Sequence, residues 1–166
     1  GGIKMSKPAY EAIQKFYDLY FGRDKIAYWM GAKGEILTRK RMQELVDAYW
    51  DYFKKYDPDR LEELMRWSEG KIGFDCSGLV CACFGTPYEM SSWTLREHMV
   101  RTVGVKECKA GSILWFPGHV EIDLGFGATG GIRSEGKTIE INDNGVGGFQ
   151  LGGELEGIDY SMMYNF

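Results

Sequence analysis

The sequence predicts an α+β domain in which helices of the first part of the chain pack on an antiparallel sheet formed by the last part. Apolar residues recur at helical spacing up to about residue 100, whereas short alternating apolar runs separated by glycine-rich stretches follow Gly111. No long helical pattern separates the predicted strands, so the sequence lacks the crossover helices that a parallel sheet needs. Helices first and strands afterwards are typical of the α+β arrangement.

The size and composition indicate one globular domain. Because single hydrophobic cores commonly hold about 100–200 residues, we expect one domain over residues 1–166, acting as a monomer. The 44% hydrophobic and 27% charged residues exclude disordered and collagen-like classes. A net charge of −4 argues against nucleic-acid binding, and no run approaches the roughly 20 apolar residues of a membrane helix. No signal-peptide pattern begins the sequence, so none is predicted in it.

Three helices are predicted before residue 70. Apolar residues at helical spacing indicate the first over 8–21. A stronger pattern behind the cap Thr38 indicates the second over 38–54. Asp57-Pro58 supplies the N-cap and the first position of a third helix, so the second and third helices form a hairpin.

Two short helices and three strands are predicted after residue 70. Small apolar residues indicate a buried helix over 76–84, and Ser91 or Ser92 caps another helix that runs to Val100. The predicted strands cover 113–116, 119–124 and 138–142.

Cys76 is the candidate nucleophile because it lies at the predicted start of a helix. Unpaired N–H groups and the positive end of the helix dipole lower the pKa of a thiol in such a position. The N–H of Cys76 is also free to help bind an oxyanion. Cys81 and Cys83 lie among apolar residues and are predicted to be inert. No pair of Cys-x2-Cys motifs is present, so no zinc site is expected.

A nucleophilic thiol needs an imidazole that takes its proton and later protonates the leaving group. The sequence holds two histidines, His98 and His119. His119 begins a predicted strand directly after Pro117-Gly118, at the edge of the sheet, whereas His98 lies in a predicted helix beside Glu97. The sequence therefore favours His119 as the base and an exposed position for His98.

Three segments together resemble the signature blocks of the NlpC/p-sixty cell-wall cysteine peptidases. They are Tyr-Trp-Met-Gly-Ala-Lys-Gly at 28–34, Phe-Asp-Cys-Ser-Gly-Leu-Val at 74–80 and Gly-Ser-Ile-Leu-Trp-Phe-Pro-Gly-His-Val at 111–120. The resemblance extends over about residues 8–142. It implies a papain-like fold, with N-terminal helices packed on a central antiparallel sheet.

The resemblance also implies roles for particular residues. Cys76 would be the nucleophile and His119 its base. Tyr28 would contribute its hydroxyl to the site, Asp75 would hold the free amine of a stem peptide, and Ser77 would line the same pocket. Judged without the family, Tyr28 fits a core aromatic residue equally well and Asp75 an ordinary helix cap.

The first departure from the family is the segment at about 35–73, where the family has a short loop. Here the sequence inserts the helical hairpin. We expect Met42, Val46 and Tyr49 to pack inward, and the insertion to form a lobe that is one wall of the substrate cleft.

The second departure concerns the polar residue that orients the histidine. Family spacing places this residue at Gly131, and glycine has no side chain for the role. A longer turn through 125–131 would bring Glu140 into register, so Glu140 is the predicted third catalytic residue and Asn142 its substitute. Glu121 and Asp123 point to the same face as His119 and remain alternatives.

The resemblance implies hydrolysis of an amide bond in peptidoglycan stem peptides, between D-glutamate and the diamino acid. The reaction would pass through a thioester on Cys76 and would use neither a metal nor an organic cofactor. An N-acetylmuramoyl-L-alanine amidase, a catalytically silent relative that binds wall fragments or a partner, and an intracellular cysteine hydrolase or transferase are the alternatives. The endopeptidase would act on the cell wall after secretion, or after release by a phage or mobile element.

Overall fold

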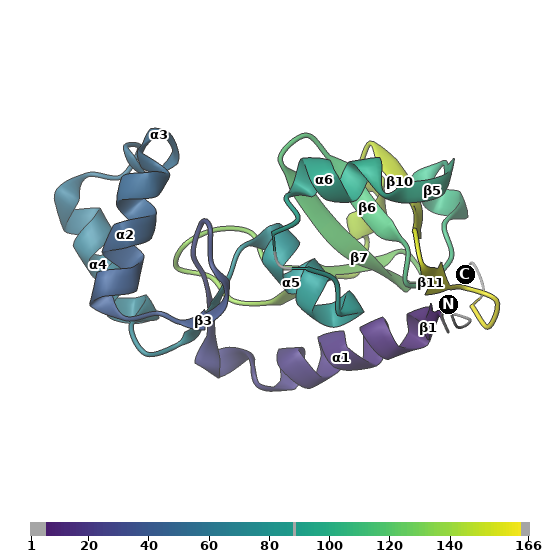
Figure 1. The fold of residues 1–166 in the computed structure, drawn as a ribbon, viewed down its shortest axis with the longest axis horizontal. Coiled ribbons are helices and arrows are strands. Elements are labelled where there is room, and N and C mark those ends of the chain that lie inside the picture. Colours follow the sequence, from purple (N-terminus) through teal and green to yellow (C-terminus); the bar gives the residue numbers. More distant parts are fainter. Residues whose placement is uncertain (1–5, 88, 164–166) are drawn as a thin grey trace, which may run out of the picture.

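Most of the helices lie in the first half of the chain and most of the strands in the second half (Figure 1). The structure is a computed structural model that describes residues 6–87 and 89–163, so both ends of the predicted domain lie outside the described residues. The helices are α1 (Ala9–Phe21), α2 (Arg39–Ala48), α3 (Trp50–Phe53), α4 (Pro58–Ser68), α5 (Cys76–Phe84) and α6 (Ser92–Glu97). Short 3-10 helices cover Arg23–Lys25 (η1), Val105–Glu107 (η2) and Gly145–Gly148 (η3).

Six antiparallel strands form the central sheet, in the order β5-β10-β6-β7-β8-β9. They are β5 (Met99–Val103), β6 (Ile113–Phe116), β7 (His119–Gly125), β8 (Ala128–Gly131), β9 (Glu140–Asn142) and β10 (Leu151–Leu155). A smaller sheet joins β2 (Ile26–Tyr28), β4 (Ile72–Phe74) and β3 (Lys33–Ile36), and β1 (Lys7–Pro8) pairs with β11 (Ile158–Asp159). The predicted antiparallel sheet is therefore present.

The main core lies between the central sheet and the helices α1 and α5. Alternate residues of β7, Val120 and Ile122, join this core, and α1 packs closely on β8. A Cβ atom at Gly130 would lie 2.3 Å from the ring of Phe16, so this approach requires glycine. The opposite face of β7 carries the polar side chains of the predicted site.

The inserted helices α2, α3 and α4 form a separate lobe at the end of the molecule opposite β5 and β10 (Figure 1). The lobe has a hydrophobic core of its own, which includes Trp29, Leu37, Met42, Phe53 and Leu64. Its two ends continue into β3 and β4, which pair with each other. The insertion is thus anchored in the small sheet that also holds Tyr28.

The buried carboxylate of Glu135 fastens the lobe to the rest of the protein. It accepts hydrogen bonds from the hydroxyls of Tyr52 and Tyr56, each at 2.7 Å, and from the N–H of Met30 at 3.0 Å. Glu135 lies in the segment between β8 and β9, far from the lobe in sequence. The inner end of the lobe therefore packs beside the strand Ile26–Tyr28.

Several predicted elements need correction. The helix predicted over 38–54 breaks at Tyr49, whose backbone is not helical, and the side chain of Tyr49 is exposed rather than packed inward. The helix predicted to reach Val100 ends at Glu97, because Met99 already pairs with β10. The glycine-rich stretch predicted as a long turn contains the strand Ala128–Gly131.

Candidate active site

Cys76 is the first residue of α5, as predicted. The carboxylate of Asp75 caps the helix by accepting a hydrogen bond from the N–H of Gly78 at 2.7 Å. The thiol is largely buried, and its Sγ lies 3.9 Å from the carbonyl oxygen of Gly118. The first turn of α5 thus points the thiol at the turn between β6 and β7.

His119 begins β7 and lies beside Cys76. A two-residue turn pairs it with Phe116, and Gly118 in this turn has a φ of +89°, which favours glycine. Burial of the imidazole opposes its charge, but its hydrogen bonds and charge interactions with Cys76 and Glu121 outweigh burial and raise the pKa of His119 to about 9. The ring also stacks on Phe149, with centroids 6.0 Å apart.

Glu121 is the carboxylate that holds the imidazole. Its Oε2 lies 2.7 Å from Nε2 of His119, which leaves Nδ1 for the thiol. Glu121 is fully buried and also accepts hydrogen bonds from Oγ1 of Thr129 at 2.8 Å and from Nε of Arg133 at 2.8 Å. Burial opposes the carboxylate charge, but the bonds from His119 and Arg133 keep the pKa of Glu121 below its usual range.

The prediction that Glu140 contacts the histidine is wrong. Strand pairing places Glu121, Gly131 and Glu140 in one row across β7, β8 and β9, so Glu140 lies two strands, or about 10 Å, from Glu121. Glu140 instead lies 3.8 Å from Nζ of Lys137. The substitute Asn142 lies opposite Thr129 on β8, two residues further along the sheet from His119 than Glu140 is. The alternative Glu121 is the residue that reaches the imidazole.

Gly131 makes room for this arrangement. A Cβ atom at position 131 would lie 2.4 Å from Cγ of Glu121. The space that a side chain on β8 would fill is therefore occupied by a carboxylate from β7, the strand of the histidine itself. The absence of a side chain at Gly131 thus allows the carboxylate of Glu121 to lie there.

Tyr28 lies close enough to the thiol for the charge of Cys76 to act on it. Burial, followed by the charge of Cys76, raises the pKa of Tyr28 far above its usual value, so its phenol stays neutral. Tyr52 of the lobe is one of its neighbours. A cavity of about 300 Å³ opens here, lined by Tyr28, Tyr52, Lys55, His119 and Arg133 among others. The lobe thus contributes to the wall of the cavity that contains the imidazole.

Asp75 and Ser77 lie under the first turn of α5 and do not line this cavity. Nζ of Lys33 lies 2.7 and 2.8 Å from the two carboxylate oxygens of Asp75 and 3.0 Å from Oγ of Ser77. Oδ2 of Asp75 also accepts a hydrogen bond from the N–H of Gly31 at 3.2 Å. An ammonium group of this chain therefore occupies the place that the resemblance assigned to a substrate amine.

The other cysteines and His98 lie away from this chemistry. Burial raises the pKa of Cys81, and it raises the pKa of Cys83 to about 12 and that of Cys108 to about 11, so these thiols stay protonated. His98 is exposed, and its Nδ1 lies 3.0 Å from Glu156. Within residues 6–87 and 89–163, no group of His, Cys, Asp and Glu is placed to hold a metal ion.

Arg133, Thr129, Tyr52 and Glu135 were not predicted as site residues. Arg133 follows Gly131 by two positions, so a strand at 128–131 was the signal that could have revealed it. Tyr52 belongs to the insertion, and its contact with Glu135 spans 83 positions. Pairings of this kind carry no local sequence pattern.

The raised pKa of His119 predicts a pH dependence of stability. An unfolded histidine has a pKa near 6.5, so the contribution of the imidazolium is complete below that pH and is lost as the pH rises towards 9. The free energy of unfolding should fall by up to about 3 kcal/mol over this window. Urea denaturation at pH 6.5 and pH 9 measures it.

Two variants make this pH test specific. His119→Gln should have a clearly smaller pH dependence, whereas His98→Gln should keep most of it, because His98 lies away from Cys76 and Glu121. Ionisation of the unfolded cysteines is common to all three proteins and cancels in the comparison. An equal change of the unfolding free energy with pH in the unaltered protein and in His119→Gln would contradict the raised pKa of His119.

The comparisons with known proteins agree with this fold. No family model matches the sequence, and no curated protein matches it either. Among solved structures, the chain is similar to the peptidoglycan hydrolase RipB of Mycobacterium tuberculosis, with a TM-score of 0.51 and 19% sequence identity. The similarity covers 96% of this chain and 76% of that chain. The predicted fold class, a papain-like α+β domain, is confirmed.

Proposed function

We propose that this protein is a cysteine peptidase of the NlpC/p-sixty type that hydrolyses an amide bond in the peptide stems of peptidoglycan. The observation that carries the chemistry is the thiol of Cys76 at a helix start, beside an imidazole held by Glu121. The substrate class is supported by the fold shared with a peptidoglycan hydrolase and by the three sequence blocks. The enzyme would act at the cell wall.

Before the first half of the proposed reaction, the Cys76 thiol gives its proton to His119, whose pKa of about 9 favours the imidazolium, and the sulfur then attacks the carbonyl carbon of the scissile amide. A carbon–sulfur bond forms and the carbonyl oxygen becomes an oxyanion. When this intermediate collapses, the carbon–nitrogen bond breaks and the imidazolium gives its proton to the leaving amine. A thioester on Cys76 remains.

In the second half, a water molecule attacks the thioester while His119 accepts one of its protons. The carbon–sulfur bond then breaks, the thiol recovers a proton from the imidazolium and the product leaves as a carboxylic acid. Glu121 keeps the same tautomer and orientation of the ring through both halves. Arg133 and Thr129 in turn hold Glu121.

Two donors are proposed for the oxyanion. The N–H of Cys76 is one of the unpaired groups at the start of α5. The phenol of Tyr28, kept neutral by its raised pKa, is a second donor close to the thiol.

The contact between Glu121 and His119 weakens the case for a silent relative. A silent relative would be expected to lack a group that orients the imidazole, and Gly131 has no side chain for that role. Since Glu121 offers a carboxylate to the imidazole, a candidate is present for each of the three roles of nucleophile, base and orienting group. Within the proposed function, we favour the bond between D-glutamate and the diamino acid, as the three sequence blocks imply.

Digestion of purified peptidoglycan tests this function. The protein and its Cys76→Ala variant are incubated with sacculi, and the released fragments are identified by mass spectrometry. New amino termini on the diamino acid would support the proposal. New termini on L-Ala would indicate an amidase, and the absence of any fragment that depends on Cys76 would overturn the proposed function.

Lys55 links the lobe to substrate binding. It lines the cavity of His119, and its Nζ lies 3.7 Å from the ring centroid of Tyr52. Stem peptides carry carboxylates, which an ammonium at the cavity wall would attract. We expect Lys55→Ala to raise KM roughly three- to tenfold at unchanged kcat, a binding loss of about 1 kcal/mol.

Lys54→Ala is the matched control for Lys55→Ala. Lys54 is the adjacent residue, is also exposed, and lies 3.5 Å from Asp51 rather than in the cavity. Its replacement should leave both kinetic constants unchanged. Steady-state rates on soluble stem peptides measure the difference. Equal effects of the two variants would contradict a role of the lobe in substrate binding.

A further inference from the structure

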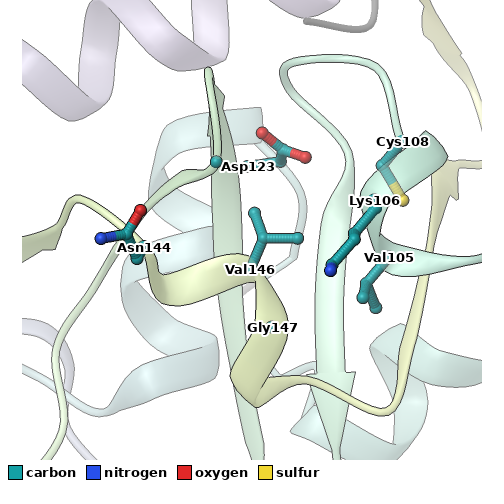
Figure 2. Close-up of a pocket in the computed structure, with 8 residues that line it drawn as sticks. Val105, Lys106, Cys108, Asp123, Asn144, Val146 and Gly147 are labelled. Atoms are coloured by element: carbon teal, nitrogen blue, oxygen red, sulfur yellow. The ribbon is translucent and has the colours of Figure 1, made fainter.

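A second cavity, of about 440 Å³, lies between the 3-10 helices η2 and η3, apart from the cavity of His119. It is lined by Val105, Lys106, Cys108, Asp123 and Val146, together with Asn144 and two glycines (Figure 2). The two cavities share no lining residue. Asp123 follows His119 by four positions on the same face of β7, about 13 Å along the strand.

Asp123 is a buried carboxylate that is only half satisfied. Its side chain stands over the space between Val146 and Cys108 (Figure 2). The residue is only 4% exposed, and its Oδ1 accepts a hydrogen bond from the N–H of Gly125 at 2.8 Å. Within the described part of the chain, no donor contacts its Oδ2. Because Asp123 lines the cavity, this oxygen can accept a hydrogen bond from a ligand that enters it.

The remaining walls define the rest of such a ligand. Val105 and Val146 supply apolar surface, and Lys106 and Asn144 are exposed side chains that line the cavity. Lys106 has no ion pair with any residue that the structure describes. A buried negative charge and an exposed positive charge therefore face one space that is large enough for a small organic molecule.

We propose that this cavity binds a small zwitterion of the amino-acid type, with its ammonium group on Asp123 and its carboxylate towards Lys106 and Asn144. The ammonium supplies the donor that Oδ2 lacks, and the short apolar part of the ligand lies against the valines. The site does not depend on the reaction at Cys76, because neither the thiol nor His119 lines it.

Titration with three small probes tests the proposal. Methyl NMR signals of Val105 and Val146 are followed while alanine, methylamine or acetate is added to the unaltered protein. Alanine should give saturable shifts, and methylamine and acetate, which each carry one of its two charges, should bind at least tenfold more weakly. No saturable shift with alanine, or equal binding of methylamine and alanine, would overturn the proposal.

Variants keep the test decisive. Asp123→Asn retains an oxygen for the N–H of Gly125 and so should fold, yet should weaken alanine binding at least tenfold. Lys106→Ala should weaken it several-fold, whereas Glu107→Gln, on the same 3-10 helix but outside the cavity, should leave it unchanged. Alanine binding that persists in Asp123→Asn would also contradict the assignment, and thermal unfolding of each variant checks its folding.

Discussion

Replacing Cys76 by alanine should reduce hydrolysis of peptidoglycan by about four orders of magnitude or more, to the background seen without enzyme. The reason is that the proposed thioester forms on this sulfur, and removal of the nucleophile from a cooperating set of groups abolishes the benefit of the others. Cys76→Ser should be nearly as inactive, because His119 is placed for a thiol and a hydroxyl is a much weaker acid. Release of soluble fragments from sacculi measures both losses.

Cys83→Ala is the matched control, since Cys83 lies on the same helix. Its thiol is buried and its pKa is raised to about 12, so it takes no part in the proposed chemistry. We expect a modest loss of stability, about 1 kcal/mol, and full activity after correction for folded protein. Hydrolysis that survives Cys76→Ala and disappears in Cys83→Ala would place the nucleophile elsewhere on α5.

Glu121→Gln should lower kcat by about a hundredfold or more. A neutral amide would no longer stabilise the imidazolium and would permit the wrong tautomer of His119. Gly131→Ala should have a comparable effect, because its new Cβ would fall 2.4 Å from Cγ of Glu121 and displace the carboxylate. Combining the two replacements should cost little more than either one, because both remove the same contact.

Glu140→Gln provides the comparison for this pair. Glu140 lies in the same cross-strand row but pairs with Lys137, so its replacement should leave kcat unchanged. A loss of activity in Glu140→Gln, or fully additive losses in the double variant of Glu121 and Gly131, would contradict the role given to Glu121. The tautomer of His119 can be read independently from nitrogen NMR shifts of its ring.

Local patterns predicted the elements that carry Cys76 and His119. The helix Cys76–Phe84 has the predicted bounds, since an N-cap carboxylate and a terminal glycine frame a short apolar segment. The strands β6 and β7 match closely as well, because alternating apolar residues flank the Pro-Gly turn. In each case, the signal lies within about ten residues.

Glu121 was predicted only as an alternative to Glu140, because the partner of His119 depends on contacts between distant elements. Glycine is depleted in strands, so the stretch 128–131 was predicted as part of a turn. In the structure, Gly130 and Gly131 belong to a strand because each faces a closely packed neighbour, the ring of Phe16 on one side and Glu121 on the other. Because the prediction did not include this strand, it placed Glu140 one strand too close to His119.

The lobe was predicted as a helical hairpin, but its attachment was not. The 3.6-residue periodicity indicates which residues form its core, and Met42 and Val46 are buried accordingly. The break at Tyr49 leaves that side chain exposed, and the bonds of Tyr52 and Tyr56 to Glu135 span about 80 positions. Periodicity within one segment contains no information about such a partner.

The single carboxylate of Glu135 also has a consequence for the order in which the protein is made. The core of the lobe draws on residues 27–65, so it can form while the later chain is still being synthesised. Glu135, which joins the lobe to the strand of Tyr28, leaves the ribosome much later, and so do His119 and Glu121. Until then the thiol of Cys76 has neither its base nor its finished cavity. On the proposed function, the partly made chain carries a cysteine without its base, and hydrolysis begins only when the sheet closes.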